Sequence, residues 1–351
     1  MDTSVMITLG FLVFAIVMFA WEKIPLSITA MIVAVGLHLS GVLSAKEAFA
    51  GFVDPNVLLF MGMFVIGEAF FATGVAVGVG NVVHKFAKTE TSLLVAVMMI
   101  TGILSGFLSN TGTAAVLIPV IIGICKKSGF KQTKLLMPLV FAAAMGGNIS
   151  LIGAPGNMIA QAGLQQAGLG SFNFFDYGLV GLPILIVGTI FYATIGKRFL
   201  PDAPSHQPDG AFEGNDDYSH VPSWKKWTAA IILILTVAAM IFEKQLGVKL
   251  YVSAWIGALV LVATNVISET AAVKSIDMKT IMLFAGSMAL GDAMVKTGTG
   301  SVVADIIVNS LGASPSPIVV LVVIFVLGVF MTNFMSNTAT CALLVPIGLS
   351  L

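Results

Sequence analysis

The residues best suited to chemistry are two copies of one polar tripeptide, each inside a long apolar run. The first is Ser109-Asn110-Thr111 and the second is Ser336-Asn337-Thr338. Ser, Asn and Thr cap helix ends with their own side chains, and their hydroxyl and amide oxygens suit a hard cation such as sodium. Helix N-termini also attract anions. The tripeptides therefore predict the tips of two re-entrant helical hairpins that meet at a site for a cation and an anion.

A simpler interpretation is that each tripeptide only caps a kinked helix, because Ser and Thr are common where membrane helices pack. Two copies at matching positions of a repeat favour a functional site instead.

A second unusual stretch, 146–157, lies in the middle of the apolar run 135–163. It holds four glycines, a proline and two asparagines, which cannot continue a regular helix. A proline kink would need fewer glycines. The stretch therefore predicts a broken helix with an unwound segment whose free carbonyl groups can coordinate a cation.

Two acidic residues, Glu68 and Asp292, lie at matching positions within apolar runs. Acids inside membrane spans are functional candidates, so both are candidates for coupling. Structural pairing is the alternative, and Lys296, one turn after Asp292, could neutralise it.

The elements that carry these residues follow from composition. The chain is 58% hydrophobic and only 10% charged, whereas soluble domains carry about a quarter charged residues. Apolar blocks of about twenty residues match the length of a spanning helix. We therefore expect an all-α polytopic protein of the cell membrane (plasma or inner membrane). The predicted spans are 5–20, 24–43, 57–80, 135–163, 178–196, 227–242, 250–267 and 280–295.

The two halves of the chain repeat. Three features recur 224 residues later in the chain: Gly62 at Gly286, Gly67 at Gly291 and Thr73-Gly74 at Thr297-Gly298. The tripeptide recurs 227 residues later, from 109 to 336. The repeat predicts a first inverted repeat over 1–200, a cytoplasmic linker over 201–226, and a second inverted repeat over 227–351. Lysine clusters lie both before the first hairpin, at Lys85 and Lys88, and after it, from Lys126 to Lys134. They place both ends of the hairpin on the cytoplasmic side and so support the inversion. We expect the second repeat to be truncated at its C-terminal end, because the first continues for about eighty residues after its hairpin.

The paired tips, the Gly-Ala-Pro-Gly-Asn break and the inverted halves resemble the divalent anion/sodium symporter family, within the wider ion-transporter superfamily. The resemblance spans essentially the whole chain. It implies sodium-coupled symport of di- or tricarboxylate anions by alternating access, and a homodimer. Ala154 departs from the hydroxyl residue often found there, which leaves the identity of the substrate open.

The resemblance also implies the site residues. The first sodium site would use Ser105, Ser109, Asn110 and Gly153. The second would use Thr332 and Asn337, with its remaining ligand beyond Leu351. The carboxylate substrate would be held by Ser109, Asn110, Thr111, Pro155, Ser336, Asn337 and Thr338.

Other functions stay open at this point. A sulfate or other anion permease, a dicarboxylate exchanger and a sodium/proton antiporter belong to the same superfamily, and Glu68 and Asp292 would matter most for antiport. A membrane enzyme is disfavoured, because the sequence shows no Ser-His-Asp arrangement and no metal-ligand cluster. Zero net charge gives no basic surface for nucleic acid.

Overall fold

The structure, a computed structural model, describes residues 2–78, 89–201, 218–311 and 316–351. The described residues form helices and no strands. The predicted linker 201–226 lies mostly outside them. In the described part of the chain, four helices are long and apolar enough to cross a membrane, and several shorter apolar helices accompany them. The four are Thr3–Trp21, Pro55–Ala72, Ser223–Ile241 and Met278–Thr297.

The chain divides into two compact units that interleave along the sequence. The first unit contains Met1–Leu58, Met158–Ser171 and Asp277–Leu351, and the second contains Leu59–Asn157 and Phe172–Ile276. Each unit therefore combines elements of both predicted repeats.

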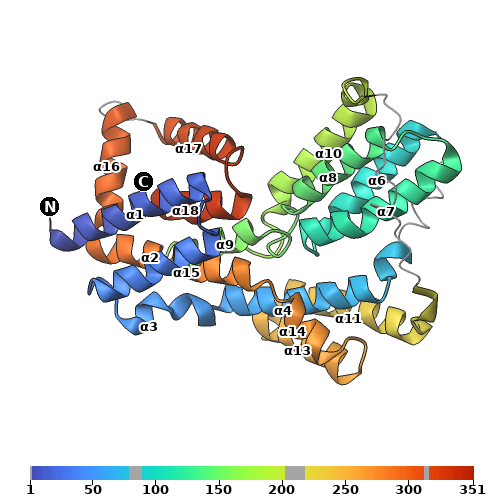
Figure 1. The fold of residues 1–351 in the computed structure, drawn as a ribbon, viewed down its shortest axis with the longest axis horizontal. Helices are drawn as coiled ribbons and strands as arrows, with labels where there is room; N and C mark the ends of the chain where they lie inside the picture. The colour runs from blue at the N-terminus through green and yellow to red at the C-terminus, as the bar shows by residue number, and fades with distance from the viewer. Residues whose placement is uncertain (1, 79–88, 202–217, 312–315) are drawn as a thin grey trace. The chain divides into compact units, whose positions relative to one another are not determined.

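The first unit packs around helix α15 (Met278–Thr297), which contacts α1, α2, α16 and α18 (Figure 1). Phe284, Ala289 and Met294 on this helix are nearly inaccessible to solvent. The other elements of the unit are α1 (Thr3–Trp21), α2 (Leu26–Leu39), α3 (Ala45–Ala48), η1 (Ala50–Val53), most of α9 (Pro155–Gln166), α16 (Thr299–Leu311), α17 (Pro317–Met331) and α18 (Asn337–Ser350).

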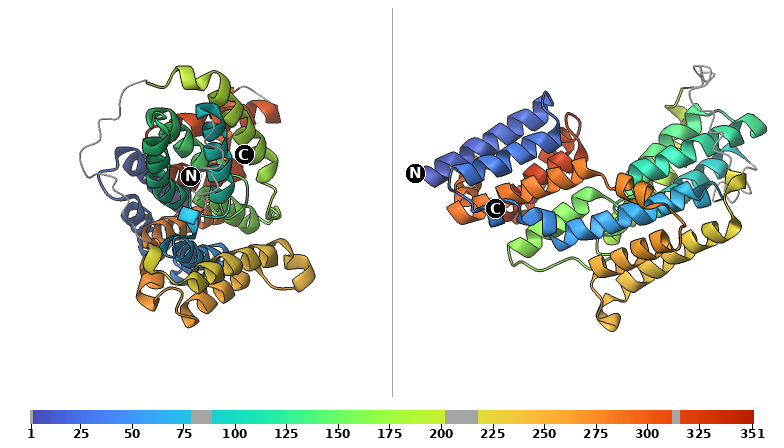
Figure 2. Two further views of the ribbon diagram at one scale, coloured as in Figure 1. Left: turned by 90° about the vertical axis from the view of Figure 1, so that its right-hand side faces the viewer. Right: turned by 60° about the horizontal axis from the view of Figure 1, so that its bottom comes forward.

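The second unit contains a bundle of α6, α7, α8 and α10, which run side by side (Figures 1 and 2). Leu94, Met98, Leu117, Leu135 and Leu185 form its buried core. The elements of this unit are most of α4 (Pro55–Ala72), α6 (Glu90–Ser105), α7 (Asn110–Ser128), α8 (Thr133–Gly146), α10 (Gly178–Thr194), η2 (Gly196–Arg198), η3 (Tyr218–His220), α11 (Ser223–Ile241), α12 (Glu243–Leu246), α13 (Leu250–Ala263) and α14 (Glu269–Ser275).

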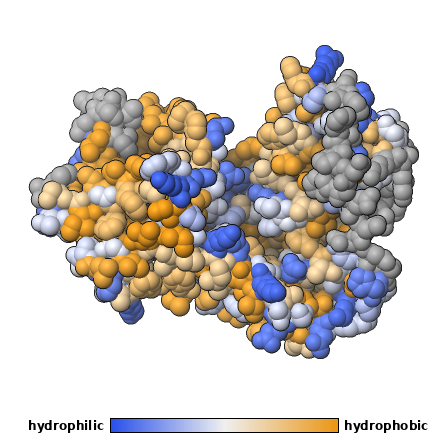
Figure 3. Space-filling view, in the orientation of Figure 1, coloured by the Kyte–Doolittle hydropathy of each residue, from blue (hydrophilic) through white to orange (hydrophobic). Residues whose placement is uncertain are grey.

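Large apolar side chains cover much of the visible surface of each unit (Figure 3). Helix α17 buries none of its residues, and Leu321, Phe325 and Phe330 on it are each more than 60% exposed. Helices whose backbone groups are satisfied internally and whose side chains are apolar are suited to contact with lipid. The surface is therefore that of a multi-pass membrane protein.

The predicted spans correspond to helices, with one correction. The helix expected over 57–80 is interrupted: α4 ends at Ala72, because Gly74 takes a left-handed conformation at φ 73°, which ends a helix. Gly298 does the same at φ 72° after α15. After Gly74, helical backbone resumes over 75–78, and residues 79 and 80 lie outside the described residues. The break predicted within 135–163 is present, since α8 ends at Gly146 and α9 begins at Pro155.

Local structure recurs between the two halves. The Thr73 hydroxyl donates to the Ala69 carbonyl at 2.7 Å, and the Thr297 hydroxyl donates to the Ala293 carbonyl at 2.7 Å. Close helix crossings also recur, as Gly62 packs on Ala254 in one unit and Gly286 packs on Ala30 in the other. These matches support the repeat, while its boundaries and its inverted orientation stay predictions.

Candidate functional site

The first tripeptide lies at the turn between α6 and α7. Helix α6 ends at Ser105 and α7 begins at Asn110. Ser109 is the N-cap of α7, and its hydroxyl accepts a hydrogen bond from the Gly112 backbone N–H at 3.0 Å. Ser109 and Thr111 are exposed at this tip, and Asn110 is half-buried. The capping expected of the tripeptide is confirmed, and its exposed hydroxyls stay accessible to a ligand.

A polar cluster lies directly beneath this tip and consists of Ser105, Asn110, Ala143 and Gly153. Ser105 is fully buried, and its hydroxyl donates its only hydrogen to the Ala143 carbonyl at 2.7 Å. The Asn110 amide is therefore assigned with its nitrogen toward Ser105 Oγ at 2.7 Å, where the nitrogen also faces the carbonyl oxygens of Gly153 (3.1 Å) and Ala143 (3.2 Å). One hydroxyl and two carbonyl oxygens thus surround a single point.

The chemistry of this cluster suits sodium. Hydroxyl oxygens and the carbonyls of unwound helices are the ligands that coordinate sodium in transporters with broken helices. A half-turn of the Asn110 amide about its terminal bond would exchange its nitrogen for a fourth oxygen. Three of the four residues that the family resemblance implies, Ser105, Asn110 and Gly153, meet here. Ser109 lies next to them but uses its hydroxyl in the cap, and the sodium role of all four stays a prediction.

Glycine is required where the break approaches the tip. A Cβ atom on Gly153 would lie 2.5 Å from the Gly147 carbonyl oxygen and 3.0 Å from that of Gly106. A Cβ atom on Gly147 would lie 2.5 Å from the Asn110 side-chain amide. Only a residue without a side chain lets these backbones approach so closely. The glycines of the break are therefore explained by the cluster rather than by a kink alone.

The Ala143 carbonyl is a member of the cluster that the sequence did not reveal. It belongs to the last turn of α8, where it accepts the Gly147 backbone N–H at 3.1 Å and the Ser105 hydroxyl at 2.7 Å. The Gly146-Gly147 pair that ends this helix was the only signal of it. Pro155 is the first residue of α9 and is half-buried, a position that proline favours. Its predicted contact with substrate is not tested.

The second tripeptide forms a similar tip between α17 and α18. Ser336 is the N-cap of α18 and accepts a hydrogen bond from the Ala339 N–H at 3.2 Å. Asn337 is exposed, and the exposed Thr332 hydroxyl donates to the Val329 carbonyl at 3.0 Å. Among the described residues no hydrogen bond joins Thr332 to Asn337. The second sodium site, like the substrate roles of Ser336, Asn337 and Thr338, stays a prediction.

The two tips belong to different units, since Asn110 lies in the second and Asn337 in the first. Their meeting at one site stays a prediction.

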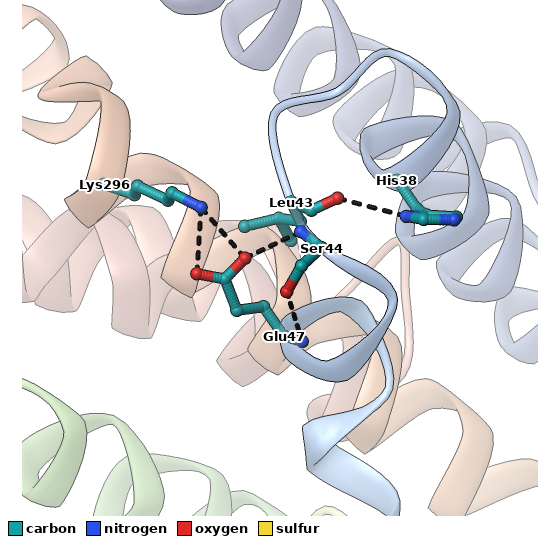
Figure 4. Close-up of polar contacts among 5 residues, drawn as sticks. All are labelled: His38, Leu43, Ser44, Glu47 and Lys296. Atoms are coloured by element: carbon teal, nitrogen blue, oxygen red, sulfur yellow. Dashed lines mark hydrogen bonds and ion pairs between the residues drawn. The ribbon is translucent and has the colours of Figure 1, made fainter.

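The two intramembrane acids are both half-buried. Lys296 does not neutralise Asp292 as proposed above, because its ammonium pairs with the Glu47 carboxylate at 2.8 and 2.9 Å (Figure 4). Within the described residues Asp292 has no ion pair. A pocket among α9, α15 and α18 includes Gly291, the neighbour of Asp292, together with Gln166 and Pro346.

The Glu47–Lys296 pair joins two segments of the first unit. Glu47 also forms a capping box with Ser44, whose backbone N–H donates to Glu47 Oε2 at 2.7 Å. The hydrogen bond from Lys296, followed by those from Ser44, lowers the pKa of Glu47 to about 2. The side chain that faces Lys296 therefore stays ionised at any physiological pH.

The sequence of this chain matches a known protein family and several transporters. A family model described as "CitMHS: Citrate transporter" matches residues 16–351. The chain is 33% identical over 211 residues to "Uncharacterized transporter YfbS" of Escherichia coli K12, a match that covers 60% of this chain and 35% of that protein. It is 27% identical over 363 aligned residues to an "Uncharacterized transporter" of Haemophilus influenzae, covering 98% of this chain and 76% of that protein.

A further relative carries a more specific name. The chain is 25% identical over 365 aligned residues to the "Sodium-dependent dicarboxylate transporter SdcS" of Staphylococcus saprophyticus, covering 93% of this chain and 69% of that protein. The chain thus spans about a third of the Escherichia coli relative and about two thirds to three quarters of the other two.

Proposed function

The chain belongs to the citrate transporter family, and on that premise we propose that it is a secondary active transporter that carries di- or tricarboxylate anions together with sodium. Membership places it among multi-pass membrane transporters and not among enzymes. The relative named as a sodium-dependent dicarboxylate transporter supports both the cation and the class of anion.

The observation that carries the proposal is the polar cluster beneath the first tip. Ser105 Oγ and the carbonyl oxygens of Ala143 and Gly153 converge on the Asn110 amide, in surroundings where Ser105 and Gly153 are buried. Sodium would bind beside these three oxygens, and Asn110 would turn its amide oxygen toward the ion. Bound sodium supplies a fixed positive charge at this point.

The anion would be held next to the cluster. Helix α7 begins at Asn110, so the backbone N–H groups of Asn110 and Thr111 and the partial positive charge of its N-terminus face the tip. The exposed hydroxyls of Ser109 and Thr111 would donate to a carboxylate, and Ser336, Asn337 and Thr338 would do the same at the second tip. Because sodium and the carboxylate would lie side by side, each would raise the affinity for the other.

Coupling would follow from alternating access. We propose that the two hairpin tips move with the bound anion against the remaining spans, and that the protein is a homodimer, as the family resemblance implies. Inverted repeats with broken helices support this mechanism, because it requires a site that can open to either side in turn. Sulfate, dicarboxylate exchange and other anions remain alternatives for the same site.

Sodium/proton antiport is a second candidate, and Asp292 favours it. This acid is half-buried, has no ion pair within the described residues and lies beside a pocket. Neutralising it as Asp292→Asn, or its repeat counterpart as Glu68→Gln, would abolish antiport. Either change would leave sodium-driven anion uptake largely intact if these acids have only a structural role.

The experiment is uptake of radiolabelled succinate, citrate and sulfate by the protein in proteoliposomes, with an inward sodium gradient or with potassium in its place. We expect uptake of a carboxylate that requires sodium. The variants Asn110→Ala and Asn337→Ala should each reduce it at least about tenfold, because each removes a proposed ligand of the bound ions. Equal uptake in potassium, or full uptake by both variants, would refute the proposal.

A further inference from the structure

The loop between α8 and α9, residues 147–154, is held by one buried side chain that the sodium site itself does not use. Asn157 lies in the first turn of α9 and is 5% exposed. Its amide nitrogen donates to the Gly147 carbonyl at 2.9 Å and to the Ser150 carbonyl at 2.9 Å. Both amide hydrogens therefore bind the same loop and fix its first turn to α9.

This loop presents one member of the polar cluster, Gly153, and its Gly147 backbone contacts a second member, Asn110. The Gly147 backbone passes so close to the Asn110 amide, and its carbonyl so close to Gly153, that neither glycine has room for a Cβ atom. A displacement of the Gly147 carbonyl would therefore be transmitted directly to Asn110 and Gly153. Because interiors are close-packed, such a displacement cannot be absorbed in an empty space between them.

Two further contacts support Asn157 and its loop. The Tyr177 hydroxyl donates to the Asn157 backbone carbonyl at 2.8 Å. The Leu151 backbone N–H donates to the Phe174 carbonyl at 2.9 Å, and the fully buried Ser150 hydroxyl donates to the Gly106 carbonyl. The segment before α10 thus binds the backbone of Asn157 and of the loop, while the Asn157 side chain binds two carbonyl groups of the loop.

We propose that Asn157 is a positioning residue for the sodium site, and that Tyr177 supports it. Asn157 fixes the Gly147 carbonyl, and through it the orientation of the Asn110 amide and the place of the Gly153 carbonyl. This inference rests on the proposed sodium-coupled function. Asn157 would affect the affinity for sodium, and it would make no direct contact with the anion.

The test measures the sodium concentration that gives half-maximal uptake, and separately the KM for the anion at saturating sodium. Loss of a group that orients metal ligands costs about 10–100-fold in affinity for the metal. We expect Asn157→Ala and Asn157→Asp to raise the half-maximal sodium concentration at least about tenfold by this mechanism. Asp has the same shape as Asn but lacks both donor hydrogens, so it isolates the two hydrogen bonds from packing.

A residue that only stabilises the fold would lower the amount of active protein without changing the sodium concentration needed for half-maximal uptake. The KM for the anion at saturating sodium should stay within about twofold of wild type, as for a substitution without direct contact. Two matched controls should also stay within about twofold. Asn148→Ala removes an exposed side chain from the same loop, and Tyr192→Phe removes a hydroxyl that has no hydrogen bond within the described residues.

Tyr177→Phe covers the case in which the Asn157 variants do not fold. It removes one neutral hydrogen bond and should raise the half-maximal sodium concentration about two- to tenfold. A second measurement is the increase in Tm of the purified protein in sodium chloride over its Tm in potassium chloride. The variants that lose most affinity for sodium should show the smallest increase.

The outcomes separate the two proposals. If wild-type uptake requires sodium but folded Asn157 and Tyr177 variants need no more sodium than wild type, the positioning role is wrong and the proposed function stands. If wild-type uptake and Tm do not respond to sodium, the proposed function is wrong and the positioning role fails with it.

Discussion

The buried hydroxyl of Ser105 gives the sharpest prediction about the sodium site. Ser105→Ala removes one oxygen from the polar cluster and leaves the backbone of α6 unchanged, because Ala is the best helix former. Ser105 is 0% exposed, so bulk water does not reach its position. Both the Ala143 carbonyl and the Asn110 amide lose a partner at 2.7 Å.

The magnitude is taken from the cost of removing one hydrogen-bonding oxygen from a buried polar group that would bind an ion. That cost is about 1–3 kcal/mol, and each 1.4 kcal/mol is a factor of about ten. If sodium binds through this hydroxyl, the half-maximal sodium concentration of Ser105→Ala should rise by about 5- to 150-fold. The maximal rate at saturating sodium should fall much less, because the anion does not contact Ser105.

The assay is sodium-dependent uptake of a labelled dicarboxylate in proteoliposomes, with Ser253→Ala as the matched control. Ser253 is also a buried helical serine, at 4% exposed, but its hydroxyl has no hydrogen-bond partner among the residues that the structure describes. Removing a buried hydroxyl without a partner is neutral or stabilising, so Ser253→Ala should keep the wild-type sodium dependence. Equal sodium dependence of Ser105→Ala and wild type would refute the assignment of this cluster to sodium.

Two further predictions concern the first unit. A Cβ atom at Gly286 would overlap the Ala30 backbone, whereas one at Gly10 would meet nothing within 4 Å. Gly286→Ala should therefore lower the free energy of unfolding by about 1–3 kcal/mol and reduce Tm, while Gly10→Ala serves as the control. Equal Tm values for the two variants would contradict the close helix crossing. The pKa of Glu47, lowered from 4.5 to about 2 chiefly by the hydrogen bond from Lys296, adds stability that is complete above pH 4.5 and is lost as the pH falls toward 2. Glu47→Gln should flatten the dependence of Tm on pH over this interval, and a profile as steep as that of wild type would exclude the pair as its cause.

The elements of the fold could be predicted from the sequence because they depend on neighbours in the chain. Apolar blocks gave the spans, and the glycines and proline of 146–157 gave the interruption between α8 and α9. Ser109 and Ser336 cap the helices that follow them, since the bond from a cap reaches only three residues ahead. The interruption of the span over 57–80 was not predicted, because apolar composition continues past Gly74, whose left-handed backbone ends α4.

Partners distant in the sequence were decided only by the tertiary structure. Lys296 forms its ion pair with Glu47, 249 residues away in the sequence, and not with Asp292, one turn away on the same helix. The Ala143 carbonyl belongs to the polar cluster because it accepts a hydrogen bond from Ser105, 38 residues away in the sequence. The Asn157 amide donates to the carbonyls of Gly147 and Ser150, in a loop whose conformation the sequence did not predict. Backbone breaks and caps follow local rules, whereas a hydrogen-bond partner is fixed by which helix faces pack together. The sequence by itself therefore predicted residues for a sodium and anion site, and that role stays a prediction, whereas packing decided which oxygens meet and which side chains hold them there.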